Sequence, residues 1–246
     1  MHPSLSVVIP AYNEAKRLPE NLKRVAAYLR AAGYASPEVL VVNDGSSDGT
    51  AVIAAKLAAE LGGGGLTVRV LENPGNRGKG YSVRHGMLEA SNDWILFSDA
   101  DLSAPIEECE KLLAAVDGGR FQGAIGSRAI DRSLIGVHQP LFRELMGRMF
   151  NLVVRTITGL RFADTQCGFK LFSRSAARRI FPKQRLERFG FDVEILYLAK
   201  KLELPVAEAP VVWNDCEGSK VRLFGGVDAF VDILRVRWND WRGRYS

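Results

Sequence analysis

Trp94-Ile-Leu-Phe-Ser-Asp-Ala-Asp-Leu102 is the stretch of sequence that decides the fold of this chain. Residues 94–98 form a short apolar run of the length of a buried strand, and two aspartates follow it directly. Similar runs occupy residues 5–10, 39–43 and 66–71, and segments with helical spacing separate them. This alternation predicts an α/β fold built on a Rossmann-like, mostly parallel sheet flanked by helices.

The same periodicities predict the helices and one further strand. Helices are expected at residues 20–32, 48–61 and 78–90, a strand at 123–127, and two long amphipathic helices at 140–159 and 226–241. The two C-terminal helices carry arginines on their polar sides, so each could lie on a membrane surface or pack against the protein's own core. Because there is no internal repeat or low-complexity linker, we expect residues 1–246 to form a single domain.

Length and composition are those of an ordinary globular protein. The chain has 246 residues, of which 47% are hydrophobic and 25% charged, so it can bury a sizeable core. Its 3 cysteines lie far apart without a Cys-x-x-Cys pair, which argues against a disulfide framework or zinc cluster and favours a reducing, cytoplasmic setting. No secretory-signal layout is present, and no apolar stretch approaches the roughly 20 residues of a spanning helix.

The positive charge is concentrated in the second half of the chain. Residues 1–119 contain 11 Lys+Arg against 15 Asp+Glu, whereas residues 120–246 contain 22 against 13, for a net charge of +5. A basic half indicates a partner that carries phosphate: a nucleic acid, an anionic membrane or a phospholipid-like substrate. Because no zinc, RNP or recognition-helix motif is present, we do not expect a nucleic acid partner.

Polar clusters follow the four predicted strands at the point where each strand ends. They are the segments 10–14 (PAYNE), 43–50 (NDGSSDGT), 73–80 (NPGNRGKG) and 99–101 (DAD). In an open parallel sheet, ligands bind at the carboxyl ends of the strands. Each cluster alone is typical of a turn or a solvated loop, but the four together predict one ligand site.

Asp99 and Asp101 are the strongest candidates for chemistry. Two adjacent carboxylates repel each other unless a cation or hydrogen bonds hold them, and their oxygens suit Mg²⁺ or Mn²⁺ bridging a diphosphate. The alternative is a pair of helix N-caps before Pro105, because Asp101 and Ser103 could both cap a helix. Lys79 lies between glycines and could neutralise phosphate charge as a nucleoside diphosphate departs. Asp44 could accept a hydrogen bond from a base or ribose, or could simply form a turn.

Three common catalytic motifs are missing from the sequence. There is no Gly-x-Gly-x-x-Gly after the first predicted strand and no Gly-x-x-x-x-Gly-Lys-Ser/Thr, which argues against a dinucleotide enzyme and a P-loop NTPase. There is also no Gly-x-Ser-x-Gly, so a serine hydrolase has no support.

At this point the chain resembles a known family, the inverting family 2 glycosyltransferases of GT-A fold. The matching segments are 10–14 (PAYNE), 42–50 (VNDGSSDGT), 76–80 (NRGKG), 98–102 (SDADL) and 126–128 (GSR). Further segments are similar to the dolichyl-phosphate β-glucosyltransferase branch: 164–172 (DTQCGFKLF), 191–194 (FDVE), Trp213 and 217–220 (EGSK).

The resemblance implies transfer of a hexose, with UDP-glucose as the preferred donor, onto a polyprenyl or dolichyl phosphate with inversion at the sugar. Residues 1–128 would then form the nucleotide-sugar-binding half, and residues 129–246 the acceptor-binding half with its amphipathic helices. Asp44 would contact the uracil, Asp99 and Asp101 would form the metal and diphosphate motif, and Arg128 would contact the acceptor phosphate.

The nature of the acceptor decides which residues are needed. A phosphate monoester is already largely an oxyanion at neutral pH, so it needs no general base and instead needs cations that bring two anions together. Arg128, Arg143 and Lys220 are the candidates, although each could merely coat the surface. Asp164 stays open between positioning the sugar or metal, acting as a base in a hydroxyl-acceptor relative, and pairing with Lys170.

The candidate site residues fall into three groups. The catalytic candidates are Asp101, Lys79, Arg128 and Asp164. The metal candidates are Asp99 and Asp101. The substrate-binding candidates are Pro10, Tyr12, Glu14, Asp44, Gly45, Ser46, Lys79, Asp99, Ala100, Arg128, Arg143 and Lys220.

Two other functions remain open on the sequence. The chain could be a family 2 transferase that acts on a protein or glycan hydroxyl, or a nucleotide-sugar-binding subunit without turnover. Lys79 and the intact pair of Asp99 and Asp101 argue against the second. With a lipid-linked acceptor and no spanning segment, we expect a cytoplasmic protein that associates peripherally with the cytosolic face of a membrane.

Overall fold

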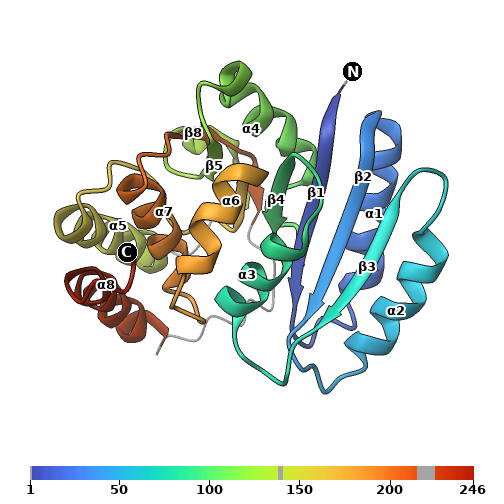
Figure 1. Ribbon diagram of the computed structural model, residues 1–246, viewed down its shortest axis with the longest axis horizontal. Coiled ribbons are helices and arrows are strands. Elements are labelled where there is room, and N and C mark those ends of the chain that lie inside the picture. Colours follow the sequence, from blue (N-terminus) through green and yellow to red (C-terminus); the bar gives the residue numbers. More distant parts are fainter. Residues whose placement is uncertain (1, 138–140, 215–224) are drawn as a thin grey trace.

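The computed structural model describes residues 2–137, 141–214 and 225–246, which form one main sheet with helices on both faces (Figure 1). The strands of this sheet are β1 (His2–Ala11), β2 (Tyr34–Asn43), β3 (Thr67–Glu72), β4 (Trp94–Ser98), β5 (Gly123–Ser127), β7 (Phe169–Ser173) and β8 (Val206–Pro210). A small second sheet pairs β6 (Ile135–Val137) with β9 (Trp213–Asn214). The α-helices are α1 (Leu18–Ala31), α2 (Thr50–Leu61), α3 (Lys79–Glu89), α4 (Cys109–Ala115), α5 (Leu141–Thr158), α6 (Arg174–Ile180), α7 (Phe191–Lys201) and α8 (Gly225–Trp241).

The main sheet is parallel except at one strand. Its order is β3-β2-β1-β4-β7-β5-β8. The first four strands in the chain run parallel, β7 runs antiparallel to both β4 and β5, and β5 runs parallel to β8. The predicted α/β fold with a mostly parallel sheet is therefore confirmed. As a result, the carboxyl ends of β1, β2, β3 and β4 lie at one edge of the sheet.

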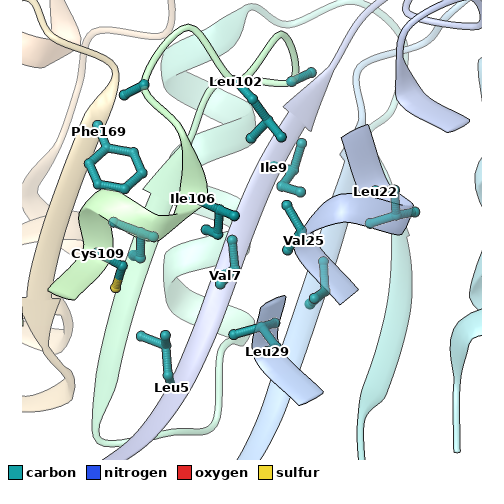
Figure 2. Packing of buried hydrophobic residues seen from close by; sticks show 14 of the residues in the cluster. Leu5, Val7, Ile9, Leu22, Val25, Leu29, Leu102, Ile106, Cys109 and Phe169 are labelled. Carbon is teal, nitrogen blue, oxygen red and sulfur yellow. The ribbon is translucent and has the colours of Figure 1, made fainter. Parts of the chain in front are cut away.

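Alternating side chains on the strands divide the core into two clusters. On β1, Val7 and Ile9 face Val25 of α1 (Figure 2), whereas Val8 points to the other face and packs in a cluster with Val83 of α3. All five side chains are buried, and burial of each contributes about 1.5–3 kcal/mol. The first cluster joins the sheet to α1, α2 and α4, and the second joins it to α3 and the helices from α5 to α8. The sheet is thus covered on both faces, as a parallel sheet requires.

The predicted elements are all present, but the second half of the chain contains more structure than expected. Each of the five predicted helices begins and ends within two residues of the positions expected. Strands β1 and β2 begin earlier than expected. The unpredicted elements include β7, α6, α7 and β8. Of these, β7 matters most for the site, because it pairs along the whole of β4 and begins opposite Ser98, the residue before the first of the two aspartates.

None of the helices in the described part of the chain combines the length and hydrophobicity that crossing a bilayer requires.

Candidate active site

The loops after β1 and β2 are bound to each other. The backbone N–H of Asn13 donates to Ser46 Oγ at 3.0 Å, and that of Ser47 donates to Asn13 Oδ1 at 2.8 Å. Gly45 has a φ of +67°, and a Cβ placed there would lie 2.6 Å from the carbonyl carbon of Gly75. Gly45 therefore lets the loop after β2 touch the backbone of the loop after β3, which no residue with a side chain could do.

Asp44 holds the loop that precedes α3. Its buried carboxylate accepts hydrogen bonds from Asn73 Nδ2 at 2.8 Å, from the backbone N–H of Arg77 at 3.0 Å and from that of Gly78 at 2.8 Å. Both carboxylate oxygens thus have protein partners, so Asp44 fixes the glycine-rich loop and with it the start of α3. Its predicted contact with uracil stays a prediction.

Lys79, the first residue of α3, connects this loop to the aspartates after β4. Its Nζ lies 2.6 Å from Asp99 Oδ1. Burial disfavours the charged ammonium, but the nearby carboxylates of Asp99 and Asp192 outweigh it and raise the pKa of Lys79 above its ordinary value. The four clusters predicted to meet are thus joined by direct contacts. The protonated ammonium of Lys79 lies beside Asp99, the first of the two aspartates.

Asp101 lies in an environment that disfavours its charge. Burial and the neighbouring carboxylate of Asp99 raise the pKa of Asp101, and a hydrogen bond of 3.0 Å from the backbone N–H of Ser103 only partly offsets them. The alternative that Asp101 or Ser103 caps a helix is wrong, because the next helical turn, Ile106–Glu108, has Pro105 at its N-cap and no side-chain cap.

Asp99 and Asp101 fit a divalent cation that a ligand also helps to hold. Mg²⁺ in nucleotide sites is commonly bound by one or two carboxylates together with phosphate oxygens. In the part of the chain that the structure describes, no group of three His, Cys, Asp or Glu side chains forms a complete metal site. A cation at the two aspartates would therefore complete its coordination with ligands from outside these side chains, such as water or the oxygens of a bound diphosphate.

The Asp99 carboxylate occupies space that a side chain at position 168 would fill. The backbone N–H of Asp99 donates to the carbonyl of Gly168 at 3.2 Å, and a Cβ at Gly168 would lie 2.2 Å from Asp99 Oδ2. We expect Gly168→Ala to displace this carboxylate and lower activity about a hundredfold, since a shift of 1 Å in a site can have that effect. Initial rates and melting temperatures test this expectation.

Gly147→Ala is the matched control. An added Cβ there meets no atom of the described residues within 4 Å, so activity should stay at the wild-type level. Equal rates in the wild-type protein and the Gly168→Ala variant would contradict a role for the Asp99 position.

Arg128 and Asp164 form a two-point ion pair. Arg128 Nε donates to Asp164 Oδ2 at 2.6 Å, and Nη2 donates to Oδ1 at 3.0 Å. Burial opposes the carboxylate charge, but Arg128 outweighs it and lowers the pKa of Asp164 to about 2. Glu208 accepts hydrogen bonds from the backbone of Asp164 and its neighbour at 2.8 Å, and the guanidinium carbon of Arg128 lies 5.3 Å from the Trp213 ring centroid. Such a carboxylate is suited to orienting Arg128 and poorly suited to accepting a proton.

A second ion pair, Lys170 with Asp192, is buried, and the carboxylate of Asp192 is one of those that act on Lys79. Lys170 is fully buried in β7, pairs with Asp192 at the start of α7, and donates to the carbonyl of Cys167 at 2.6 Å. The alternative that Asp164 pairs with Lys170 is therefore wrong. Sequence reasoning missed this pair, although a single lysine within the apolar run 169–172 was a signal that a buried partner exists.

The remaining residues of the first and fourth loops lie at the same edge. Pro10 is half-buried near the end of β1, Tyr12 is exposed, and Glu14 pairs with Arg17 at 2.8 Å. The carbonyl of Ala100 accepts a hydrogen bond from an α1 asparagine at 2.7 Å. Their predicted roles in substrate binding stay predictions.

Two predicted acceptor residues cannot be placed. Lys220 lies outside the described residues, and Arg143 belongs to α5 but its side chain lies outside the described part. Of the three predicted acceptor cations, the structure thus places only Arg128 within the described chain. Burial opposes its charge, but Asp164 and, to a smaller extent, Asp99 outweigh burial and raise the pKa of Arg128.

The sequence is similar to that of known glycosyltransferases. The model of the family "Glycosyl transferase family 2" matches residues 6–181. The chain is 41% identical over 253 residues to dolichyl-phosphate beta-glucosyltransferase of Drosophila melanogaster and 38% identical over 253 residues to the protein of the same name from Homo sapiens. Each comparison covers 97% of this chain and 77% of the relative.

Solved structures with low sequence identity share the fold. Mannosyl-3-phosphoglycerate synthase from Rubrobacter xylanophilus matches 98% of this chain and 75% of its own, with a TM-score of 0.71 and 19% identity. Glucosyl-3-phosphoglycerate synthase from Mycobacterium tuberculosis, in complex with Mn²⁺, UDP and glucosyl-3-phosphoglycerate, matches 95% and 80%, with a TM-score of 0.68 and 17% identity. The sheet described above is thus that of the GT-A glycosyltransferases. From the extent of these matches, the chain belongs to glycosyl transferase family 2.

Proposed function

We propose that this protein transfers glucose from UDP-glucose, with inversion, onto a polyprenyl phosphate such as dolichyl phosphate. The observation that carries the proposal is the contact of Lys79 with Asp99, beside Asp101, at the point where four strand-end loops meet. The names of relatives that are 33–41% identical over nearly the whole chain support the glucosyl group and the dolichyl phosphate acceptor.

On the donor side, the residues handle the charge of a nucleoside diphosphate. Asp99 and Asp101 would hold Mg²⁺ or Mn²⁺, and such an ion neutralises the charge that develops on the departing diphosphate. The Lys79 ammonium, kept protonated by Asp99 and Asp192, adds a second positive charge at the same place. Asp44 would contact the uracil while it holds the loop that carries Lys79.

On the acceptor side, the residues bring a second anion to the sugar. The acceptor phosphate is already largely ionised near neutral pH, so no side chain has to remove a proton before it attacks. Arg128 offers a rigid guanidinium whose Nε and Nη2 are fixed by Asp164. One displacement at the anomeric carbon would invert it and give a β-linked lipid phosphate from an α-linked donor. We place this reaction at the cytosolic face of a membrane, with the protein peripherally attached.

The direct test is incubation of the purified protein with labelled UDP-glucose, polyprenyl phosphate and Mg²⁺ or Mn²⁺. We expect the label to become chloroform-soluble and this transfer to stop when a chelator is added. Label that appears only in protein or in water-soluble glycans would point instead to a hydroxyl acceptor. Absence of transfer with any common nucleotide sugar would contradict the proposal.

Arg128→Ala should raise the KM for the acceptor about 10- to 100-fold and change the KM for the donor little, because a hydrogen bond to a charged group is worth about 1.5–3 kcal/mol. Steady-state kinetics with each substrate varied in turn measures the split. Arg128→Lys keeps the charge but loses the two-point pairing. Its KM for the acceptor should lie between those of the wild-type protein and the Arg128→Ala variant.

The matched control for Arg128 is Arg24→Ala. Arg24 pairs with Glu107 at 2.9 Å on the exposed surface of α1 and should be dispensable. Melting curves identify any variant that fails to fold. Equal increases in both KM values would assign Arg128 to the donor.

A further inference from the structure

Helix α8 is apolar on two opposite sides. Ile233 and Val236 are buried against the core. On the other side, four large apolar side chains are exposed to solvent: Val231 by 39%, Leu234 by 58%, Trp238 by 50% and Trp241 by 76%. They follow one another at steps of three, four and three residues, which places them on one stripe of the helix. We call these four residues the outer stripe.

Arginines border the outer stripe on both sides. The stripe together with Arg235 and Arg237 lines a shallow, widely open depression on the surface of α8. The guanidinium carbon of Arg242 lies 4.8 Å from the ring centroid of Trp238, and Arg235 pairs with Asp232 at 2.9 Å. Tryptophan and arginine are residues that settle at a membrane–water interface, where the ring or the aliphatic stem contacts acyl chains and the polar group meets headgroups.

Helix α5 adds apolar surface next to α8. The two helices pack through Phe150 and Phe230, whose ring centroids are 5.3 Å apart. Figure 1 shows both helices at the end of the molecule away from α1 and α2. On α5, Met149 and Leu152 are 51% and 65% exposed. Scattered apolar side chains are normal on a surface, but a set this large in one region marks an interaction site.

The cations beside the outer stripe, Arg235, Arg237 and Arg242, favour an anionic occupant, and the half of the chain that carries them is basic as a whole. Residues 120–246 carry 22 Lys+Arg against 13 Asp+Glu. A second copy of the chain on the outer stripe would bring the arginines of both copies together, which is unfavourable, whereas phospholipid headgroups would complement them. We propose that the outer stripe and its flanking arginines dock this protein on a bilayer that contains anionic phospholipid. This inference rests on the proposed function for its choice of a lipid, because a polyprenyl phosphate acceptor lies in such a bilayer.

The test measures binding of the full chain to vesicles of phosphatidylcholine with and without phosphatidylglycerol. We expect binding only with the anionic lipid and weaker binding as salt is raised. Trp238→Ser with Trp241→Ser should lower the partition coefficient at least about tenfold, since each change removes a large apolar side chain from the interface. Arg237→Gln should lower it about fivefold, the effect of about 1 kcal/mol per cation near an anionic surface.

Val52→Ser is the matched control, because Val52 is a 74% exposed apolar residue on α2, far from the outer stripe. It should bind vesicles as the wild-type protein does. In a second measurement, lipids brominated near the headgroup should quench tryptophan fluorescence in the wild-type protein and much less in the double tryptophan variant.

Three results would overturn the inference: no vesicle binding by the wild-type protein, equal binding by the double tryptophan variant, or a wild-type dimer that this variant converts to a monomer.

A measurement of sugar transfer to a short, water-dispersed polyprenyl phosphate distinguishes failure of this inference from failure of the proposed function. If the double variant keeps that transfer and the outer stripe proves irrelevant to vesicles, only the docking inference fails. If vesicles are bound as expected but the wild-type protein transfers no sugar, the proposed function fails.

Discussion

Sugar transfer by the Asp101→Asn variant is expected to be slower by on the order of a thousandfold than transfer by the wild-type protein. Asparagine keeps the shape and one oxygen but removes the negative charge that would hold a divalent cation against the diphosphate. Loss of one preorganised electrostatic contact in an active site typically lowers kcat by about 10²- to 10³-fold. Initial rates at saturating donor and acceptor give the comparison.

The fold should not suffer from this change. Burial and Asp99 already raise the pKa of Asp101, so an uncharged side chain relieves an unfavourable interaction. We expect the melting temperature of Asp101→Asn to equal or exceed that of the wild-type protein. We also expect the variant to lose any thermal stabilisation by Mn²⁺ together with UDP, because a ligand stabilises only a protein that binds it.

Asp93→Asn is the matched control, because Asp93 directly precedes β4 and pairs with Arg174 at 2.8 Å, at the other end of the strand from Asp99. Its activity should be unchanged. Transfer by Asp101→Asn at the wild-type rate would contradict the metal role of the pair.

Lys170→Met is expected to lower the free energy of unfolding by about 3–5 kcal/mol, which is the typical result of removing one partner of a buried ion pair. The variant leaves the buried carboxylate of Asp192 without the cation that neutralises it. Denaturant unfolding followed by circular dichroism measures the difference. Lys111→Met is the control, since Lys111 pairs with Glu108 at the surface and such pairs contribute at most about 1 kcal/mol.

The loss of unfolding free energy in Lys170→Met, relative to the wild-type protein, should depend on pH. Burial raises the pKa of Asp192, and Lys170 and Lys79 oppose that effect. Without Lys170 the pKa rises further, so the folded variant binds a proton that the unfolded chain releases. Its stability then falls as pH rises above the ordinary pKa of an aspartate, and the deficit is smallest under acidic conditions. A deficit that does not change with pH would show that lost packing, rather than the uncompensated charge of Asp192, causes the destabilisation. The double variant with Asp192→Asn should recover part of the loss.

The sequence predicted the first half of the fold well because its signals there are local. Runs such as residues 5–10 and 94–98 are apolar, short and bounded by turn-forming residues, and these features do not depend on distant contacts. The same holds for the long amphipathic helix expected at residues 140–159, which is α5 in the structure. The resemblance to glycosyltransferases of GT-A fold placed these elements in the right architecture.

The order of the later strands was not predictable in this way. In β7, residues 169–172 are all buried, and the adjacent apolar residues Leu171 and Phe172 break the alternation of apolar and polar residues that would mark a half-exposed strand. Its place between β4 and β5 depends on pairing with segments far away in the chain. The partner of Lys170 is equally distant, and no spacing rule links a lysine to an aspartate on another element.

The site was predictable in its location but not in its pairings. The polar clusters that follow the strands can be recognised in the sequence, and the sheet brings them together as expected. That Asp44 binds the backbone of the next loop, and that Asp164 binds Arg128, follows only from the packed structure. The predicted roles of these residues in binding substrate remain predictions.

The insertion of β7 also has a consequence for how the chain folds as it leaves the ribosome. Strands β1 to β4 can pair with one another as soon as they are made, but the free edge of β4 gains its neighbour only when residue 173 has emerged. Strand β5 must wait as well, since its neighbours β7 and β8 are both synthesised after it. During that interval the apolar edge of a half-built sheet is open to other nascent chains, and such edges invite aggregation. We therefore expect this protein to depend on chaperones during synthesis more than its stability after completion would suggest.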